Sequence, residues 1–357
     1  MLFEHSGGLS QNFGTSSPGH EYLINDAGLI SGAWVDNAAN HRGQHSLSSP
    51  AAPAAPLTPP APTLVGTSSG LEIDLIWDSS VATAPNGFTQ AIVDAAKYYT
   101  SLFSTKEVIN INVGWNEIAG SALSSGALGE SESYGYLTNY ATVAHALEQD
   151  GYSFTASNEP TKSQFFVTSA EAKGLGLANG TTVGSASLDG FIGFGSLSGS
   201  GDAWNLHGST TGSNTGTGAN QFDLEAVALH EISEIMGRIG IEGERVNGKS
   251  TYTPLDLFDF NRPGVLELSG NGGYFSVNDG ATNLGTYNKA STNGGDIADW
   301  ASSKSISQSG TLGLISGDFD AYDAFSPPSY NGAVSQSDVI EDAALGFGLT
   351  LAGREIA

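Results

Sequence analysis

The stretch 222–238 sets the strongest limit on how this chain can fold. Its apolar residues recur at close to helical spacing, and Gly237 can end a helix in the left-handed conformation. Asp223, or Asn220 before it, can cap the start. The pattern therefore predicts a mostly buried helix of about four turns. Its apolar positions are Leu224, Val227, Ala228, Ile232 and Ile235.

Three residues of this helix form a candidate metal site. His230 and Glu234 are four positions apart, so they lie on one face, roughly 6 Å apart along the axis, and together can bind one zinc ion. Glu231 is rotated by about 100°, where it could deprotonate a water activated by the metal. In the zincin motif His-Glu-x-x-His the fifth residue is a second His, whereas here it is Glu234. A carboxylate is an accepted zinc ligand.

The alternative is an amphipathic helix with a satisfied His and two solvated Glu residues. Two features favour the metal site. The carboxylates sit within an apolar helix, where unpaired charge is costly. Gly237 also follows Glu234 by three residues, a spacing that resembles the His-Glu-x-x-His-x-x-Gly signature of metzincin peptidases.

Composition limits the partners and the compartment. The 357 residues carry 12 Lys and Arg against 37 Asp and Glu, a formal charge of -25, which argues against nucleic acid or an anionic membrane as a partner. No signal peptide and no apolar run of about 20 residues is visible, so no membrane insertion is expected. The absence of Cys, the high Gly content and the few basic residues are typical of bacterial proteins secreted by a signal-peptide-independent, type I-like route.

The first 68 residues are expected to be a mostly disordered leader or pro-segment. They are rich in Gly, Ser, Ala and Pro, and the run 49–62 is a semi-rigid Pro-rich linker. Solvation is the simpler explanation of the four His in this part than a metal role; they are His5, His20, His41 and His45. Two subdomains are expected to follow, 69–240 ending in the motif helix and 241–357 completing the site.

The order of elements after the leader indicates an α+β fold. Strands are expected at 71–77, 108–114 and 165–168, with a Gly-rich strand at 189–195 that could lie at an edge of the sheet. Helices are expected at 86–103, 136–150 and 169–175. The prediction is a mixed twisted sheet with two long helices, the active-site helix and an irregular Gly/Asn-rich C-terminal subdomain.

With these elements in place, the chain resembles a bacterial family of secreted zincin-like metallopeptidases with a His-Glu-Ile-Ser-Glu-x-Met-Gly-Arg helix. The resemblance covers about 70–350 and implies a metzincin-like fold whose last helix packs behind the active site. Beyond the motif helix it is carried by the segments Thr253–Phe258, Tyr274–Gly280, Thr282–Asn288, Gly295-Asp296, Asp299-Trp300, Asp323–Phe325 and Ser337–Gly346.

The third metal ligand departs from the metzincin pattern, because no His follows His230 and Gly240 stands at the matching position. Asp256 is the first candidate, since it lies in the matching Leu-Asp-Leu-Phe segment and a carboxylate can bind zinc. The alternative is that Asp256 caps a turn or pairs with a cation. Asp259 is the second candidate for the ligand and His207 the third.

Two further features remain open at this point. Tyr252, Tyr274 or Tyr287 could stabilise an oxyanion, as could Arg238, although capping the helix or pairing with a buried carboxylate is the simpler role for Arg238. The Gly/Asn/Asp-rich stretch 269–296 could bind Ca²⁺, or it could be a series of turns.

The sequence thus predicts a secreted zinc-dependent endopeptidase that acts as a monomer on protein or peptide substrates. Glu231 is the expected general base, and His230, Glu234 and Asp256 are the expected metal ligands. The alternative is a catalytically inactive surface, adhesive or matrix protein on a peptidase-derived scaffold. A third reading, supported by composition alone, is a carbohydrate-binding module.

Overall fold

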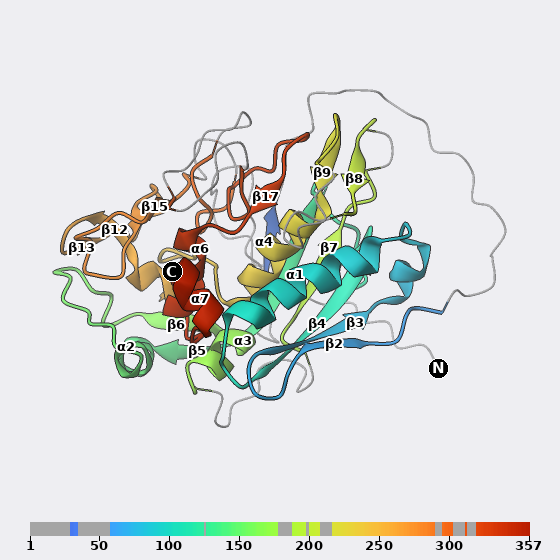
Figure 1. The fold of residues 1–357 in the computed structure, drawn as a ribbon. Helices are drawn as coiled ribbons and strands as arrows, with labels where there is room; N and C mark the ends of the chain where they lie inside the picture. The colour runs from blue at the N-terminus through green and yellow to red at the C-terminus, as the bar shows by residue number, and fades with distance from the viewer. Residues whose placement is uncertain are drawn as a thin grey trace.

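The computed structural model describes 29–34, 58–124, 126–177, 188–197, 200–207, 216–289, 295–302, 311–312 and 319–357. Its largest element is a nine-stranded sheet, in which eight strands lie in the order β10-β11-β6-β5-β7-β4-β3-β2 and β1 pairs with β5 (Figure 1). The bounds are β1 Leu29–Trp34, β2 Thr63–Gly66, β3 Glu72–Trp77, β4 Val108–Trp115, β5 Gly129–Asn139, β6 Gln164–Thr168, β7 Gly190–Phe194, β10 Arg245–Val246 and β11 Lys249–Tyr252.

The sheet is mixed, as the sequence predicts. β3, β4 and β7 run parallel to one another, and β5 runs antiparallel to β7. The expectation of an edge position for the Gly-rich strand is wrong, because β7 lies between β4 and β5. Its glycines instead permit close contacts across the sheet faces: a side chain at Gly193 would overlap the carbonyl of Glu117.

β5 pairs with three strands of the sheet and runs antiparallel to each of them. Its residues 129–133 pair with β7 along one edge. Along the opposite edge, 135–139 pair with β6 and 129–134 pair with β1. Residues 129–133 of β5 are therefore paired on both edges and 135–139 on one, and β1 extends the line begun by β6.

Two helices cover one face of the sheet. α1 (Phe88–Leu102) and α4 (Leu224–Met236) pack side by side, and α4 also contacts β5 and β7 (Figure 1). Residues of β3 alternate between buried and half-buried, so the face toward the helices forms the core and the other face is partly open. The shorter helices are α2 Tyr140–Gln149, α3 Ser169–Gly174, α6 Gln336–Ala344 and α7 Leu351–Ile356.

The C-terminal residues form small sheets that join the same core. A single hydrophobic cluster contains residues from both parts of the chain, from Val65 to Phe347, and β11 pairs with β6 of the main sheet. The additional strands are β8 Ala203–Asn205, β9 Gln221–Asp223, β12 Asp259–Arg262, β13 Val265–Leu266, β14 Tyr274–Phe275, β15 Gly285–Thr286, β16 Phe319–Asp320 and β17 Gly332–Ala333.

The structure differs from the sequence predictions in two further places. The start of the expected helix 136–150 belongs to β5, and α2 begins only at Tyr140, where the Asn139 side chain accepts a hydrogen bond from the amide of Thr142. Within the expected leader, β2 pairs with β3 and β1 pairs with β5. The longest described helix, α1, has 15 residues, and none in the described part of the chain combines the length and apolar composition that a membrane span requires.

Candidate metal centre

α4 is held at both ends. The strand β9 leads into it, and the carboxylate of Asp223 accepts hydrogen bonds from the amides of Glu225 and Ala226. Gly237 ends the helix with φ 122°. All 13 residues of α4 are buried, because helices, strands and C-terminal segments surround it. Its polar side chains therefore face protein on every side.

Three of these buried groups come together at one point. Ligand atoms of His230, Glu234 and Asp299 all lie within 4.8 Å of one another. His230 Nε2 is 3.4 Å from Glu234 Oε1 and 3.3 Å from Asp299 Oδ1. The i, i+4 pair on α4 is thus joined by a carboxylate from the segment that follows β15. We refer to these three residues as the trio.

A backbone carbonyl on the far side of the ring from the carboxylates orients the imidazole of His230. Its Nδ1–H donates a hydrogen bond of 2.9 Å to the carbonyl of Ala321, which leaves Nε2 directed at the two carboxylates. The ring of Tyr322 lies edge-on to it at 6.4 Å between centroids. A backbone carbonyl that fixes the tautomer in this way is the usual support of a metal-binding His.

Both carboxylates of the trio are also held. The hydroxyl of Ser131 on β5 donates to Glu234 Oε2 at 2.5 Å. Arg238 Nη1 donates to Asp299 Oδ1 at 2.6 Å, and its Nε donates to Ser233 Oγ at 2.7 Å. The guanidinium lies 4.5 Å from the centre of the Tyr322 ring. Arg238 therefore pairs with a buried carboxylate, which is the simpler of the roles expected for it.

The charges of these groups depend on one another. Burial alone would raise the pKa of Asp299, but the neighbouring His230 and Arg238 more than offset this and lower it to about 2. Burial and Arg238 lower the pKa of His230, yet Asp299 and Glu234 outweigh them and raise it above its ordinary value. The trio thus attracts positive charge, whether it is a proton, a guanidinium or a metal ion.

Glu231 lies beside the trio, on the side toward β5. Its carboxylate touches the backbone of Gly129, where any side chain would overlap Oε1. Neither carboxylate oxygen has a hydrogen-bond partner among the described residues. Burial first, and then the charges of Glu234 and Glu130, raise the pKa of Glu231 well above its ordinary value. A cation bound at the trio would favour its ionised form.

The other sequence-predicted ligands lie outside the trio. Asp256 Oδ2 accepts hydrogen bonds from the amides of Thr253 (2.7 Å) and Glu242 (3.2 Å), which matches the alternative that it caps a turn. Asp259, at the start of β12, is packed against Gly273. His207 is exposed at the end of β8. His5, His20, His41 and His45 lie outside the described residues.

The tyrosines considered for an oxyanion role have other contacts. The Tyr287 hydroxyl donates to Glu341 Oε1 at 2.6 Å, and that of Tyr274 donates to the carbonyl of Gly280 at 2.6 Å. Tyr252 is half-buried and packs against Phe165. Tyr322, which the sequence did not single out, is the tyrosine that contacts both His230 and Arg238.

The trio fits a metal ion. Two ligands on a tetrahedral zinc ion, each at about 2.0–2.1 Å from it, are about 3.3–3.4 Å apart. The separations from His230 Nε2 to the two carboxylates are 3.4 and 3.3 Å. The buried His, Glu and Asp can therefore hold a metal ion. Within the described residues no second group of three such ligands occurs, and part of the stretch considered for Ca²⁺, 290–294, lies outside them.

Comparisons of the chain with protein-family models, with curated proteins and with solved structures find no match in any of the three. The site therefore rests on its own geometry. Asp299 is the residue that sequence reasoning missed as a ligand. The signal was present, because Asp299-Trp300 is one of the segments that carry the resemblance, but nothing in the sequence ranked it above Asp256.

Proposed function

We propose that the chain is a secreted zinc-dependent endopeptidase in which His230, Glu234 and Asp299 hold the metal and Glu231 is the general base. Asp299 takes the place that the sequence assigned to Asp256. Secretion rests on the composition of the chain, and the substrate is a protein or peptide.

The observation that carries this proposal is the spacing of the trio. A helical His and Glu four residues apart are joined by Asp299 at the separation expected for ligands of one zinc ion. The Nδ1–H of His230 already donates a hydrogen bond to the carbonyl of Ala321, which leaves Nε2 for a metal ion. Imidazole nitrogen and carboxylate oxygen are both accepted zinc ligands, and three protein ligands leave the fourth position open to a water or a substrate.

The remaining residues have roles that follow from their contacts. Zinc, when bound, would polarise a water and the peptide carbonyl. Glu231 would take a proton from the attacking water and return it to the leaving amine. Ser131 and Arg238 would orient the two carboxylates. The role of general base requires Glu231 to become ionised at the pH of the reaction.

A second candidate function is a catalytically inactive surface or matrix protein, and one observation favours it. The guanidinium of Arg238 already supplies a positive charge to Asp299 at 2.6 Å and lies 3.7 Å from Glu234 Oε1. His230 and Glu231 are fully buried. On this reading the trio is a structural ion-pair network, and the fold needs no metal.

Metal content decides between the two. The wild-type chain, reconstituted with Zn²⁺ at neutral pH and desalted, is compared with Asp299→Asn and Asp256→Asn by mass spectrometry. Both substitutions preserve side-chain volume at a buried aspartate, but only Asp299 belongs to the trio. About one zinc per chain in wild type and Asp256→Asn, with loss in Asp299→Asn, is the expected result.

Activity is measured on an unstructured protein such as casein. Glu231→Gln should retain zinc and lose at least about 10²-fold of the cleavage rate, since a general base typically contributes that much or more. Absence of zinc from the wild-type chain would overturn the peptidase proposal and favour the structural network. Retention of zinc in Asp299→Asn with loss in Asp256→Asn would restore the ligand that the sequence first indicated.

A further inference from the structure

The leader strand β1 occupies one edge of the half of β5 that contacts the candidate site. It pairs antiparallel with β5 from Leu29↔Tyr134 to Trp34↔Gly129. Over the same residues the other edge of β5 pairs with β7, and β6 ends its pairing at Gly135. Among the described residues, β1 is thus the strand that keeps this half of the edge from being open.

This half of β5 also contacts the residues of the proposed active site. Gly129 touches the carboxylate of Glu231, and Ser131 donates to Glu234. An extended chain on the adjoining edge lies one strand spacing away, about 4.8 Å. A peptide that paired with this edge would run beside the residues of β5 that contact Glu231 and Glu234, and β1 now occupies that position.

The sequence of β1 explains why this part of the leader pairs. Four of the six residues of Leu29-Ile30-Ser31-Gly32-Ala33-Trp34 are apolar, in a segment otherwise rich in Gly, Ser, Asn and Pro. Branched and aromatic residues favour strands, and an unpaired strand edge offers N–H and C=O groups to any such segment. Added strands of this kind are a recurring mode of peptide recognition.

We propose that β1 is an internal blocking strand: it occupies the β5 edge, 129–134, on which an extended peptide substrate would lie, and so restrains the enzyme until the leader is displaced. The occupied edge is a feature of the fold alone. The restraint of cleavage rests on the proposed peptidase function.

The length of the tether makes this blocking effective. Between β1 and β2 lie 28 residues, 35–62, which can extend to at most about 100 Å. The two strands are separated by five strand spacings, about 24 Å, in the sheet. A tether that spans its sites without strain holds the strand at an effective concentration on the order of millimolar. Cutting within 35–62 would remove that advantage without any change in β1 itself.

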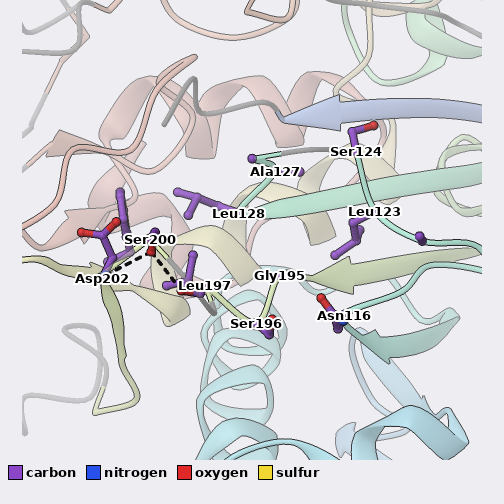
Figure 2. A pocket seen from close by; sticks show the side chains of 13 residues that line it. Asn116, Leu123, Ser124, Ala127, Leu128, Gly195, Ser196, Leu197, Ser200 and Asp202 are labelled. Carbon is purple, nitrogen blue, oxygen red and sulfur yellow. Dashed lines mark hydrogen bonds between the residues drawn. The ribbon is translucent and has the colours of Figure 1, made fainter. Parts of the chain in front are cut away.

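The edge also leads to a hollow that a peptide could use. A pocket of about 320 Å³ lies at the start of β5, lined by Ser124, Ala127 and Leu128 before the strand and by Gly195 and Leu197 after β7. Figure 2 shows it beside the ends of β5 and β7, with β1 running along β5. Because Trp34 pairs with Gly129, a chain that continued beyond the position of Trp34 would arrive at this pocket.

Cross-linking tests the pairing in the full chain, which has no Cys of its own. Ser31 and Glu132 are register partners, so the variant Ser31→Cys/Glu132→Cys brings two Cα atoms to the 4.5–5.5 Å that a disulfide accepts. The matched control Gly32→Cys/Glu132→Cys is shifted by one residue, which turns the two side chains to opposite faces of the sheet. Oxidation should link the first pair and leave the control unlinked.

Peptide binding tests whether the edge is a docking surface. The open variant is Ser31→Pro/Gly32→Pro, which removes strand hydrogen bonds, and its control is Asn40→Pro/His41→Pro, outside β1. A fluorescent peptide of residues 27–36 should bind the open variant at least about tenfold more tightly than the wild-type chain or the control. It should not bind the disulfide-linked form. These measurements need neither zinc nor activity.

Cleavage of casein completes the test. The open variant should be at least about tenfold faster than wild type, and the linked form should lose activity and regain it on reduction. Failure of the Ser31/Glu132 pair to link, or equal peptide binding in open and linked forms, would overturn the blocking strand. Equal cleavage rates in active open and linked forms would overturn its inhibitory role. Peptide binding as expected, with no cleavage by any form, would leave the occupied edge established and refute the peptidase function instead.

Discussion

Two groups of carboxylates in this molecule, one fully buried and the other including the half-buried Glu242, have opposite electrostatic character. The trio contains Glu234 and Asp299 together with an imidazole and the guanidinium of Arg238. The second group, here called the acidic group, consists of Glu242, Asp256 and Asp259 near β12. Within the acidic group the carboxyls of Glu242 and Asp259 interact with each other, and Asp256 is held by backbone amides.

The difference shows how neighbours decide the charge of a buried carboxyl. Neighbouring His230 and Arg238 hold the pKa of Asp299 at about 2 despite burial. Burial, followed by the charges of Asp256 and Asp259, raises the pKa of Glu242 to about 10, and burial raises that of Asp256 to about 7. The trio could therefore hold a cation, whereas the acidic group favours bound protons. Asp256 and Asp299 look equivalent in the sequence and differ in this respect.

Removing Arg238 should have the largest effect on the difference between the two groups, because it takes away a cation that pairs with the trio. Arg238→Met leaves Asp299 with a buried charge and one fewer cation, and loss of one partner of a buried pair costs about 3–5 kcal/mol. The free energy of unfolding is measured by urea denaturation of the zinc-free chain. Lys97→Met, which removes an exposed pair with Asp94, is the control and should cost less than about 1 kcal/mol. Equal effects in the two variants would show that Arg238 does not anchor the trio.

The acidic group should make the free energy of unfolding depend on pH. Glu242 has a folded pKa raised from 4.5 to about 10, so between these values the folded chain binds a proton that the unfolded chain releases. The free energy of unfolding should therefore fall as pH rises across this window. Glu242→Gln should reduce the loss of thermal midpoint between pH 6 and pH 9 by about 3 °C or more.

The exposed neighbour Glu244 provides the control for this experiment, because Glu244→Gln changes the same net charge at the surface. Its pH profile should follow that of the wild-type chain. A Glu242→Gln profile identical to wild type would mean that the acidic group does not store a proton in the folded state.

The smallest expected effect concerns the support of the trio by β5. Ser131→Ala removes the hydroxyl that donates to Glu234 Oε2, and loss of such a support typically weakens metal affinity by about 10–100-fold. We expect about tenfold, measured by competition with a zinc chelator. Ser133→Ala, whose hydroxyl lies 3.4 Å from the Glu234 carbonyl and not from the carboxylate, should change the affinity by less than about twofold. A larger loss of zinc affinity in Ser133→Ala than in Ser131→Ala would show that the Ser131 hydroxyl is not the support of Glu234.

The sequence predicted the elements whose pattern is dominated by apolar burial. The helix at 86–103 and the strands at 71–77 and 108–114 agree with α1, β3 and β4 to within about two residues. The motif helix agrees with α4, and its placement of His230 and Glu234 on one face follows from helical periodicity alone. Such patterns reflect local chain geometry, which the sequence contains.

The strand β5 was missed for a physical reason. Its residues beside α4 are Gly129, Ser131 and Ser133, which are small enough for the helix to approach, and the Ser131 hydroxyl donates to the carboxylate of Glu234. A strand that serves a buried polar site lacks the apolar alternation by which strands are recognised. Asp299 was missed for a related reason, because its contact with His230 spans 69 residues of chain, is set by tertiary packing and leaves no local signal.

The double pairing of β5 has a consequence for its stiffness. A strand bonded on both edges exchanges its amide hydrogens only when one neighbour departs, whereas a strand with an open edge exposes every second amide to water. Amides of 129–134 that face β1 should therefore be protected in the intact chain and exchange rapidly when β1 leaves. Since Ser131 belongs to the same six residues, the exchange rate of this short segment would report, at one time, whether the leader is in place and how firmly Glu234 is held.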